Sequence, residues 1–311
     1  MANQIKLIFG TAFIAPLGDE TINEFLRILE HNGVKELDSA RLYKGSEEAL
    51  GKAGAPSRFT IDTKAPGFFK GSLSKSSVLA GIEKSFNDLG VEHVDTYFLH
   101  CPDPDTPLEE TLSVIQELFE AGKFDRWGLS NFTPAQVQQI YDFMSAKGYV
   151  LPTVYQGNYN AVARANETDL LPLLRKLAIK FYAYSPIAGG FLVKDVAAIK
   201  DGIAGDRWGK DEMYSRLYGK PKLLAALDEW QSIADEAGVT KAALAYRWVA
   251  FNAHLDAKYG DAVIFGASSV KQLQETLKAL HDGPLPSTIA TKIDSIWENI
   301  KDEAPVDNYN G

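Results

Sequence analysis

Short apolar runs alternate along the chain with longer amphipathic segments. The apolar runs predict eight β-strands, at residues 5–10, 33–38, 59–63, 94–99, 124–129, 153–156, 179–183 and 262–265. The spacing of apolar positions between and after these strands predicts helices at residues 19–31, 74–89, 107–121, 134–147, 169–177, 221–237, 241–253, 270–280 and 287–301. A strand followed by a helix is therefore the repeating unit.

Several predicted helices carry recognisable end signals. Gly90 and Gly122 directly follow two of them, in the position where glycine commonly ends a helix. Thr133 followed by Pro134 is typical of an N-cap with proline in the first helical position. These signals support the division of the chain into separate strand and helix units.

Strands that are separated by helices pair in parallel through right-handed crossovers. Eight such units in roughly 250 to 300 residues have the size of one closed barrel. The alternative, an open doubly wound sheet, usually has a glycine-rich phosphate loop after its first strand, and residues 9–13 lack that spacing. We therefore predict an α/β fold, a (β/α)8 TIM barrel in a single domain over residues 1–311, with a long loop at 189–219 after strand 7 and a C-terminal helix.

Composition excludes several classes of function. The 311 residues hold 32 Lys and Arg against 41 Asp and Glu, a net charge of −9, so neither a nucleic acid nor an acidic membrane surface is an expected partner. The apolar runs are shorter than the ~20 residues of a membrane helix, and the N-terminus lacks a secretory signal. The single cysteine excludes an internal disulfide and a cysteine-based zinc site. We expect a cytoplasmic protein.

Four polar residues stand at or just after predicted strand ends, where the reactive groups of such barrels gather. They are Asp38, Tyr43, Lys64 and His100. Each has an ordinary structural explanation when it is considered alone, such as a helix cap, a wall aromatic, a surface lysine or a core histidine. Their joint placement at one face of a barrel favours a catalytic role.

The chemistry that these residues suggest is proton donation to a carbonyl oxygen. A tyrosine hydroxyl has a free pKa of about 10, and a nearby ammonium group lowers it by stabilising the phenolate. We expect Lys64 to lower the pKa of Tyr43 and Asp38 to hold Lys64 in place. His100 would donate a hydrogen bond to the substrate oxygen and orient it.

The other candidate nucleophile and metal ligands do not form a site in the sequence. Cys101 follows His100 directly, and neighbouring strand residues point to opposite faces, so we expect its thiol to point away from the site. The remaining histidines lie on helix ends or loops without the spacing of metal ligands: His31, His93, His254 and His281. No metal is expected.

Six longer segments follow one another in a distinctive order. They read ELDSARLY at residues 36–43, IDTK at 61–64, VDTYFLHCPD at 94–103, WGLSNF at 127–132, PTVYQGNYNA at 152–161 and FYAYSPIAGGFL at 181–192. Over essentially the whole chain they resemble the aldo-keto reductases, whose fold is a (β/α)8 barrel. PTVYQGNYNA, RWGKDEMYSRLY at 207–218 and the tail helix are most similar to the branch of aflatoxin-aldehyde and succinic-semialdehyde reductases.

The resemblance implies an NADPH-dependent reductase of aldehydes, with ketones as a further substrate class. Asp38, Tyr43, Lys64 and His100 match the family's catalytic tetrad, with Tyr43 as general acid. Ser130, Asn131 and Gln156 match residues that hydrogen-bond the nicotinamide carboxamide, and Tyr184 matches the aromatic that stacks on its ring. The loop over the pyrophosphate is implied at Ser185, Gly189, Gly190 and Leu192.

The adenosine end of the cofactor is implied at the start of the last barrel helix. Ser268, Lys271 and Gln272 would hold the 2′-phosphate there, with Glu275 near the adenine. Gln272 and Thr276 stand where many members have Arg and Asn. The strength of the preference for NADPH over NADH is therefore left open.

Substrate contacts are expected at Phe13, Phe68, Arg207 and Tyr218. The branch is associated with acidic aldehydes through an Arg on the long loop and one at the C-terminal end. This chain ends in Asn-Tyr-Asn-Gly, so recognition of a substrate carboxylate stays open. Members of the branch are often dimeric, which makes a homodimer a further expectation.

Two other functions are compatible with the same residues. One is a catalytically weak, NADP-binding regulatory subunit similar to the potassium-channel β subunits, although no N-terminal extension precedes residue 5. The other is an aldolase that forms a Schiff base on Lys64. The aldolase would leave Ser130, Asn131 and Gln156 without a role.

Overall fold

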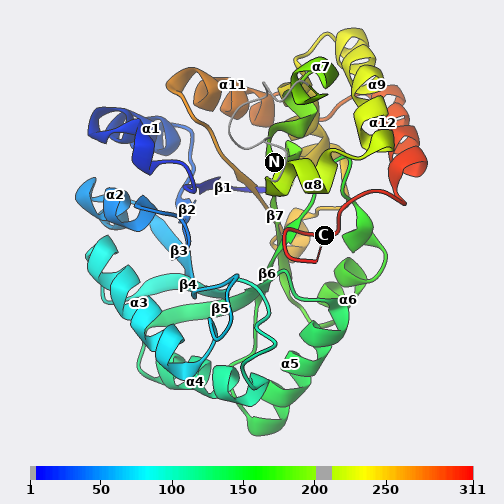
Figure 1. Ribbon diagram of the computed structural model, residues 1–311. Helices are drawn as coiled ribbons and strands as arrows, with labels where there is room; N and C mark the ends of the chain where they lie inside the picture. The colour runs from blue at the N-terminus through cyan, green and yellow to red at the C-terminus, as the bar shows by residue number, and fades with distance from the viewer. Residues whose placement is uncertain (1–4, 201–211, 311) are drawn as a thin grey trace.

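Eight parallel strands close into a barrel in which each strand pairs with the next along the chain and β8 pairs with β1 (Figure 1). The computed structural model describes residues 5–200 and 212–310. The strands are β1 (Lys6–Gly10), β2 (Glu36–Asp38), β3 (Thr60–Lys64), β4 (Val94–Leu99), β5 (Phe124–Ser130), β6 (Val154–Asn158), β7 (Lys180–Tyr184) and β8 (Ala262–Phe265). The predicted (β/α)8 barrel is confirmed.

Helices surround the barrel (Figure 1). They are α1 (Asp19–His31), α2 (Ser46–Lys52), α3 (Lys75–Leu89), α4 (Leu108–Glu120), α5 (Pro134–Lys147), α6 (Leu170–Lys176), α7 (Val196–Lys200), α8 (Met213–Tyr218), α9 (Pro221–Ala237), α10 (Lys241–Arg247), α11 (Val270–His281) and α12 (Ser287–Ile300). Short 3-10 turns lie at Ala15–Leu17, Ala55–Ser57, Ala165–Glu167, Ala188–Val193 and Ala257–Tyr259. None of the described helices is long and apolar enough to cross a membrane.

All nine predicted helices form, and the sequence signals at their ends explain where they start and stop. Thr133 caps α5 in a capping box with Gln136. Ser74 caps α3 by accepting a hydrogen bond from the amide of Ser77, and Gly90 ends α3 at a φ of +69°. The α-helical part of the predicted 241–253 helix ends at Arg247 and continues as a π-helical turn over Trp248–Asn252.

The sequence pattern missed the short helix α2 and treated the connection from β7 to α9 as a loop. α2 contains Gly51, which weakens its helical signal, yet a Cβ at this position would lie 2.2 Å from the carbonyl oxygen of Asp88 at the end of α3. The predicted loop 189–219 includes part of the Ala188–Val193 turn, α7 and α8. Such helices of five to seven residues are too short to show a clear apolar period.

The core has two parts that together leave the reactive groups at one end of the barrel. Large apolar side chains fill the space between the barrel and its helices. A smaller cluster plugs the barrel interior and is made of Ile8, Phe98, Val154, Tyr182, Ala262 and Ile264. β3, β5 and β7 each run one residue further than predicted, so that Lys64, Ser130 and Tyr184 are their last residues.

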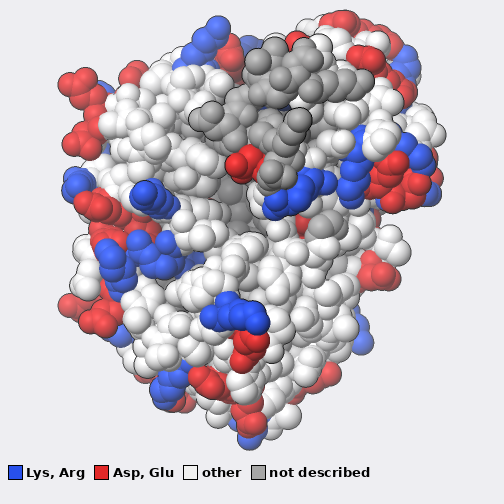
Figure 2. Space-filling model, in the orientation of Figure 1, with Lys and Arg blue, Asp and Glu red and all other residues white. Residues whose placement is uncertain are grey.

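Charges on the visible face are mixed in sign. Figure 2 shows Lys and Arg interspersed with Asp and Glu around the edge of this face, and uncharged side chains across much of its middle. A protein surface that binds nucleic acid normally carries a broad basic patch. On this face, positive side chains are instead interspersed with negative ones.

Candidate active site

Four predicted catalytic residues meet at the C-terminal ends of β2, β3 and β4. Nζ of Lys64 donates hydrogen bonds to Oδ1 and Oδ2 of Asp38, at 2.6 and 2.8 Å, and to the carbonyl oxygen of Ser39 at 2.7 Å. Lys64 is only 1% exposed, so this ion pair is shielded from water. The three acceptors use all three protons of the ammonium group and fix its position.

Tyr43 and His100 lie above this ion pair. Nζ of Lys64 is 5.2 Å from the centre of the Tyr43 ring. The rings of Tyr43 and His100 meet edge to face, with centroids 5.9 Å apart and planes at 84°. A tyrosine hydroxyl, an ammonium group and an imidazole are thus brought together from Tyr43, Lys64 and His100, which lie far apart along the chain.

The expected lowering of the Tyr43 pKa is wrong for this arrangement. Burial, with a further contribution from the charge of Asp38, raises the pKa of Tyr43 well above its usual value. The physical reason is that a phenolate here would be buried and close to the carboxylate of Asp38, which offsets part of the attraction of Lys64. Tyr43 is therefore protonated at neutral pH, as a proton donor must be.

The imidazole of His100 is neutral at the same pH. Burial, and after it the charge of Lys64, holds the pKa of His100 well below its usual value. Nδ1 of His100 is buried and has no hydrogen-bond partner among the described residues. A neutral imidazole has one N–H, which can donate a single hydrogen bond to an oxygen in the site.

The predicted nicotinamide residues lie beside the tetrad. Ser130 and Gln156 are opposite each other in the register of β5 and β6, and both are buried. Asn131 donates to the carbonyl oxygen of His100 at 2.8 Å and accepts from the hydroxyl of Tyr184 at 2.7 Å. Gln156 donates to Oδ1 of Asp38 at 2.5 Å. Ser130, Asn131 and Gln156 can hydrogen-bond a planar amide once the side chain of Gln156 has turned away from Asp38.

The glycines of the predicted pyrophosphate loop have left-handed backbone angles. Gly189 has a φ of +64° and Gly190 a φ of +98°. A Cβ at Gly189 would lie 2.1 Å from the ring of Tyr214, on α8. Close packing of α8 on this loop is thus a second reason for glycine there. Ser185, at a φ of +55°, and the buried Leu192 complete the predicted loop.

The predicted phosphate residues at the start of α11 form a helix cap. Ser269 is the N-cap and accepts from the amide of Gln272 at 3.3 Å. Oε1 of Gln272 in turn accepts from the amide and hydroxyl of Ser268, at 3.0 and 2.7 Å. Lys271 is exposed and lies 3.8 Å from Glu275. Lys271 and Glu275 are accessible, whereas Gln272 is already engaged.

The predicted substrate residues are distributed unevenly. Phe13 and Phe68 are 46% and 40% exposed after β1 and β3. Tyr218 is buried and shares hydrogen bonds with Asn158 and Asn160, at 3.1 and 3.3 Å. Its hydroxyl thus holds α8 against the barrel, and the substrate contact of Tyr218 stays a prediction. Arg207 lies outside the described residues.

The C-terminal segment after α12 supplies site residues that the sequence did not reveal. Asn308 donates its amide to the hydroxyl of Tyr184 at 3.3 Å, and the side chain of Asn310 donates to the carbonyl oxygen of Asn131 at 3.2 Å. Asp307 is buried and accepts the amides of Tyr309 and Asn310 at 2.8 and 2.6 Å. In the sequence, the sign of this arrangement is the turn chemistry of Asp307 and Asn310, since an Asp side chain often accepts the backbone amides that follow it.

The segment also closes a pocket beside the site and returns to the middle of the molecule (Figure 1). This pocket, of about 300 Å³, lies between α8 and the chain end and is lined by Met213, Arg216, Leu217, Lys220, Asn308 and Tyr309. Tyr309 in turn meets Phe68, with ring centroids 6.0 Å apart. A substrate of some size could extend from the tetrad toward this pocket.

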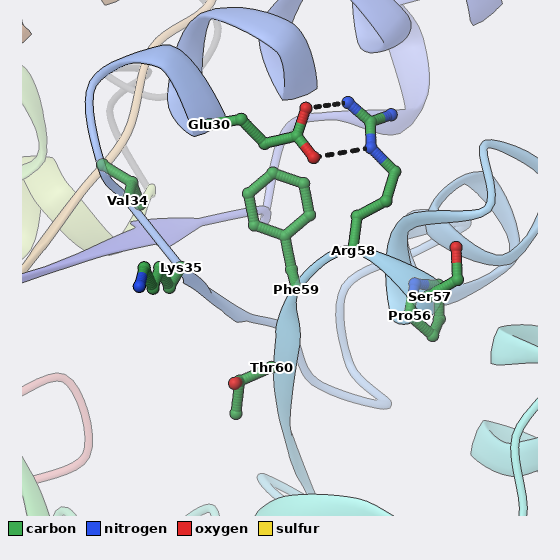
Figure 3. Close-up of a pocket in the computed structure, with 8 residues that line it drawn as sticks. All are labelled: Glu30, Val34, Lys35, Pro56, Ser57, Arg58, Phe59 and Thr60. Carbon is green, nitrogen blue, oxygen red and sulfur yellow. Dashed lines mark hydrogen bonds and ion pairs between the residues drawn. The ribbon is translucent and has the colours of Figure 1, made fainter.

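A larger pocket, of about 520 Å³, contains none of the predicted site residues (Figure 3). It is lined by Glu30, Val34, Lys35, Pro56, Ser57, Arg58, Phe59 and Thr60. Thr60 is the first residue of β3, so this pocket lies at the opposite end of the strands from Lys64. The Arg58–Glu30 ion pair spans it. It is not the active site of a barrel whose reactive groups stand at the C-terminal strand ends.

Cys101 is buried, and its sulfur accepts a hydrogen bond from the amide of Phe68 at 3.1 Å. Burial raises the pKa of the thiol to about 11. Since the thiolate is the reactive form, Cys101 is a poor nucleophile. β4 ends at Leu99, so Cys101 lies on the loop after the strand.

Comparison with known proteins agrees with the fold and the site. A sequence model described as the Aldo/keto reductase family matches residues 6–298. Oxidoreductase sirO of Leptosphaeria maculans is 39% identical across 96% of this chain and 95% of its own length. Human aflatoxin B1 aldehyde reductase member 2 is 36% identical across 96% of this chain and 86% of its own length. The chain therefore belongs to the aldo/keto reductase family, a family of oxidoreductases that act on carbonyl compounds.

Proposed function

We propose that the protein reduces aldehydes to alcohols with NADPH, and that Tyr43 is the proton donor. The observation that carries this proposal is the buried Lys64–Asp38 pair next to the ring of Tyr43, which in turn meets His100. A reduction of this kind places negative charge on the carbonyl oxygen in the transition state. The site offers that oxygen a hydroxyl proton and an imidazole N–H, next to a fixed cation.

The residues act in separate ways. His100 orients the carbonyl oxygen with its single N–H. Tyr43 keeps its proton while the oxygen is neutral and releases it as charge develops there, because only then does the oxygen become the stronger base. Lys64 stabilises the phenolate that remains, and Asp38 with Ser39 prevents the ammonium from moving away.

Side chains suited to the cofactor extend from the tetrad to the start of α11. Bound NADPH supplies the hydride. Ser130, Asn131 and Gln156 are the buried amide and hydroxyl groups for the carboxamide, and Tyr184 is the aromatic for the ring face. Lys271 and the N-terminus of the twelve-residue helix α11 provide positive charge for the phosphate. Their alignment along one face of the barrel supports NADPH.

Tyr43→Phe tests the proposal. We expect oxidation of NADPH with nitrobenzaldehyde to fall by roughly 10²- to 10⁴-fold in kcat. Tyr149→Phe, in the segment between α5 and β6, is the matched control and should keep full activity. Near-normal turnover of Tyr43→Phe would show that another group donates the proton.

The hydrogen bonds of Lys64 argue against the alternative of a Schiff-base aldolase. Such an enzyme needs an unprotonated amine that can attack a carbonyl carbon. All three protons of Lys64 are directed at acceptors, two of them on a carboxylate. Borohydride trapping of a substrate on Lys64 in the absence of nicotinamide would reverse this conclusion.

A further inference from the structure

A buried carboxyl group lies one layer below the catalytic ion pair and has no part in the proposed reaction. Asp62 and Lys64 are two residues apart on β3, so both side chains point into the barrel. In the strand register Asp62 lies opposite Asp38 of β2 and Thr96 of β4. Asp62 is 0% exposed.

The oxygens of this carboxyl group are unsatisfied. In the part of the chain that the structure describes, neither oxygen of Asp62 has a hydrogen-bond partner, and the same holds for Oε1 of Glu36. Carboxylate oxygens of Asp62, Glu36 and Asp95 lie within 4.8 Å of one another. The hydroxyl of Thr96 donates to Asp95 at 2.9 Å. Buried carboxylates without donors are rare, so a missing proton is the simplest explanation.

The ion pairs inside the barrel leave the carboxyl group of Asp62 without a cationic partner. Four ion pairs occupy this region: Lys6 with Glu36, Arg126 with both Glu36 and Asp95, and Lys64 with Asp38. Asp62 is a fourth carboxyl group and is within salt-bridge distance of no cation among the described residues. An ionised carboxylate buried without a partner is strongly unfavourable and normally takes up a proton instead.

We propose that Asp62 is a proton-binding site, whose carboxyl group stays protonated at neutral pH and donates a hydrogen bond to Oε1 of Glu36. One proton then removes the unpaired charge of Asp62 and satisfies an oxygen on each carboxyl group. It also leaves Asp38 as the only ionised carboxylate next to Lys64. This last consequence concerns catalysis and rests on the proposed function, whereas the proton site itself does not.

The surroundings of Asp62 favour the neutral acid. Burial raises the pKa of Asp62 well above its usual value, and the charges of Glu36 and Asp38 act in the same direction. Burial likewise raises the pKa of Tyr182, which is therefore uncharged. The remaining charged groups that face this region are Lys6 of β1, Lys64 of β3, Asp95 of β4, Arg126 of β5 and the partly exposed Lys180 at the start of β7.

A metal ion is the competing occupant, because three carboxylates within 4.8 Å can bind a divalent cation. Lys6 and Arg126 already lie against Glu36 and Asp95. A divalent ion would have to displace or repel these two cations in order to bind Glu36 and Asp95. A proton on Asp62 requires no such displacement, and we therefore assign the site to a proton.

Asp62→Asn tests the proposal, because an amide donates the same hydrogen bond and has no proton to lose. Above the unfolded-state pKa of about 3.9, the unfolded chain releases a proton that the folded chain keeps, so the wild type loses stability as the pH rises. In urea unfolding between about pH 5 and pH 8, we expect the unfolding constant of the wild type, relative to Asp62→Asn, to rise by up to about tenfold per pH unit.

Asp261→Asn is the matched control. Asp261 is equally buried, but its carboxylate accepts hydrogen bonds from Arg175 at 2.7 and 2.5 Å. Loss of that ion pair should destabilise the protein throughout the pH range.

In infrared difference spectra, the carbonyl band of a protonated carboxylic acid should be present in the wild type and absent from Asp62→Asn.

Three outcomes would overturn the proposal. The first is a loss of stability in Asp62→Asn that does not depend on pH, including failure to fold. The second is the absence of the carboxylic-acid band from the wild type, and the third is that Mg²⁺ or Ca²⁺ stabilises the wild type but not Asp62→Asn. None of these measurements uses NADPH or a carbonyl substrate. A failure here is therefore distinguishable from a failure of the proposed function.

Discussion

Phe68 lies edge-on to the imidazole of His100, with ring centroids 5.1 Å apart and ring planes at 87°. On its other side Phe68 meets Tyr309 from the C-terminal segment. Phe68 has a φ of +67°, and its amide is bound by the sulfur of Cys101. The wall next to the proposed reacting oxygen is thus built from three separate parts of the chain.

Tyr309→Ala should weaken substrate binding more than it slows chemistry, because Tyr309 contacts Phe68 and no member of the tetrad in the contacts described. An aromatic pair contributes about 0.5–1.5 kcal/mol, so KM for an aryl aldehyde should rise roughly two- to tenfold with little change in kcat. Steady-state kinetics provide the measurement. Tyr259→Ala, an exposed tyrosine in the turn before β8, is the control, and an equal effect there would contradict a specific role for Tyr309.

Asp38→Asn should destabilise the protein strongly, since it leaves the Lys64 ammonium buried without its carboxylate. Breaking a buried ion pair from one side costs about 3–5 kcal/mol in the free energy of unfolding. Urea unfolding measures this quantity. Glu117→Gln breaks the exposed pair with Lys75 and should cost less than about 1 kcal/mol. Similar losses in the two variants would mean that the Lys64 pair is not buried in solution.

The neutral His100 predicts a loss of stability in acid. Its folded-state pKa is lowered, so below the unfolded value of about 6.5 the unfolded chain takes up a proton that the folded chain refuses. The contribution of His100 is therefore complete above that pH and declines as the pH falls. His100→Gln should make the melting temperature less dependent on pH between about pH 7.5 and pH 5. His31→Gln, an exposed position, should follow the wild type, and parallel curves for His100→Gln would disprove the assignment.

Gly189→Ala should be more harmful than an alanine at another left-handed glycine. Gly189 and Gly238 both have a φ of +64°, but only at Gly189 would a Cβ meet another group, the Tyr214 ring. Gly238→Ala reports the backbone strain alone, about 1 kcal/mol. We expect a larger loss for Gly189→Ala in urea unfolding, partly restored by Tyr214→Ser. Equal losses at the two glycines would show that Tyr214 moves aside freely.

Gln272→Arg should strengthen the preference for NADP⁺ over NAD⁺. The substitution exchanges the cap hydrogen bonds from Ser268 for a cation at the start of α11. A charge-assisted hydrogen bond contributes about 1.5–3 kcal/mol, so Kd for NADP⁺ should fall roughly tenfold or more while Kd for NAD⁺ stays nearly constant. Fluorescence titration measures both. A parallel change for the two nucleotides would place the 2′-phosphate elsewhere.

Much of the fold follows from local pattern. The strands and nine of the helices were predictable because each carries its own apolar period and end signals, as Thr133 and Gly90 illustrate. The meeting of Asp38, Tyr43, Lys64 and His100 was predictable for a related reason, since parallel strands bring their C-terminal ends to one face, while the catalytic roles of these residues stay predictions. The single-domain organisation and the homodimer stay predictions.

Contacts between residues of the site were harder to predict from the sequence. The C-terminal segment reaches Asn131 across 179 positions, and Gln156 reaches Asp38 across 118. No periodicity relates such distant residues. The raised pKa of Tyr43 has the same origin, because it depends first on the burial of the hydroxyl and then on the charge of Asp38 nearby in space.

Hydrophobic periodicity and chain direction are enough to predict the order of strands and helices, the closed barrel and the face on which Asp38, Lys64 and His100 stand. They do not predict that Gln272 binds Ser268, that Tyr218 is buried against Asn158 or that Asp62 lies near Glu36 without a hydrogen-bond partner among the described residues. Each of these outcomes is set by what fills the space around a side chain, and that space exists only after the barrel has closed.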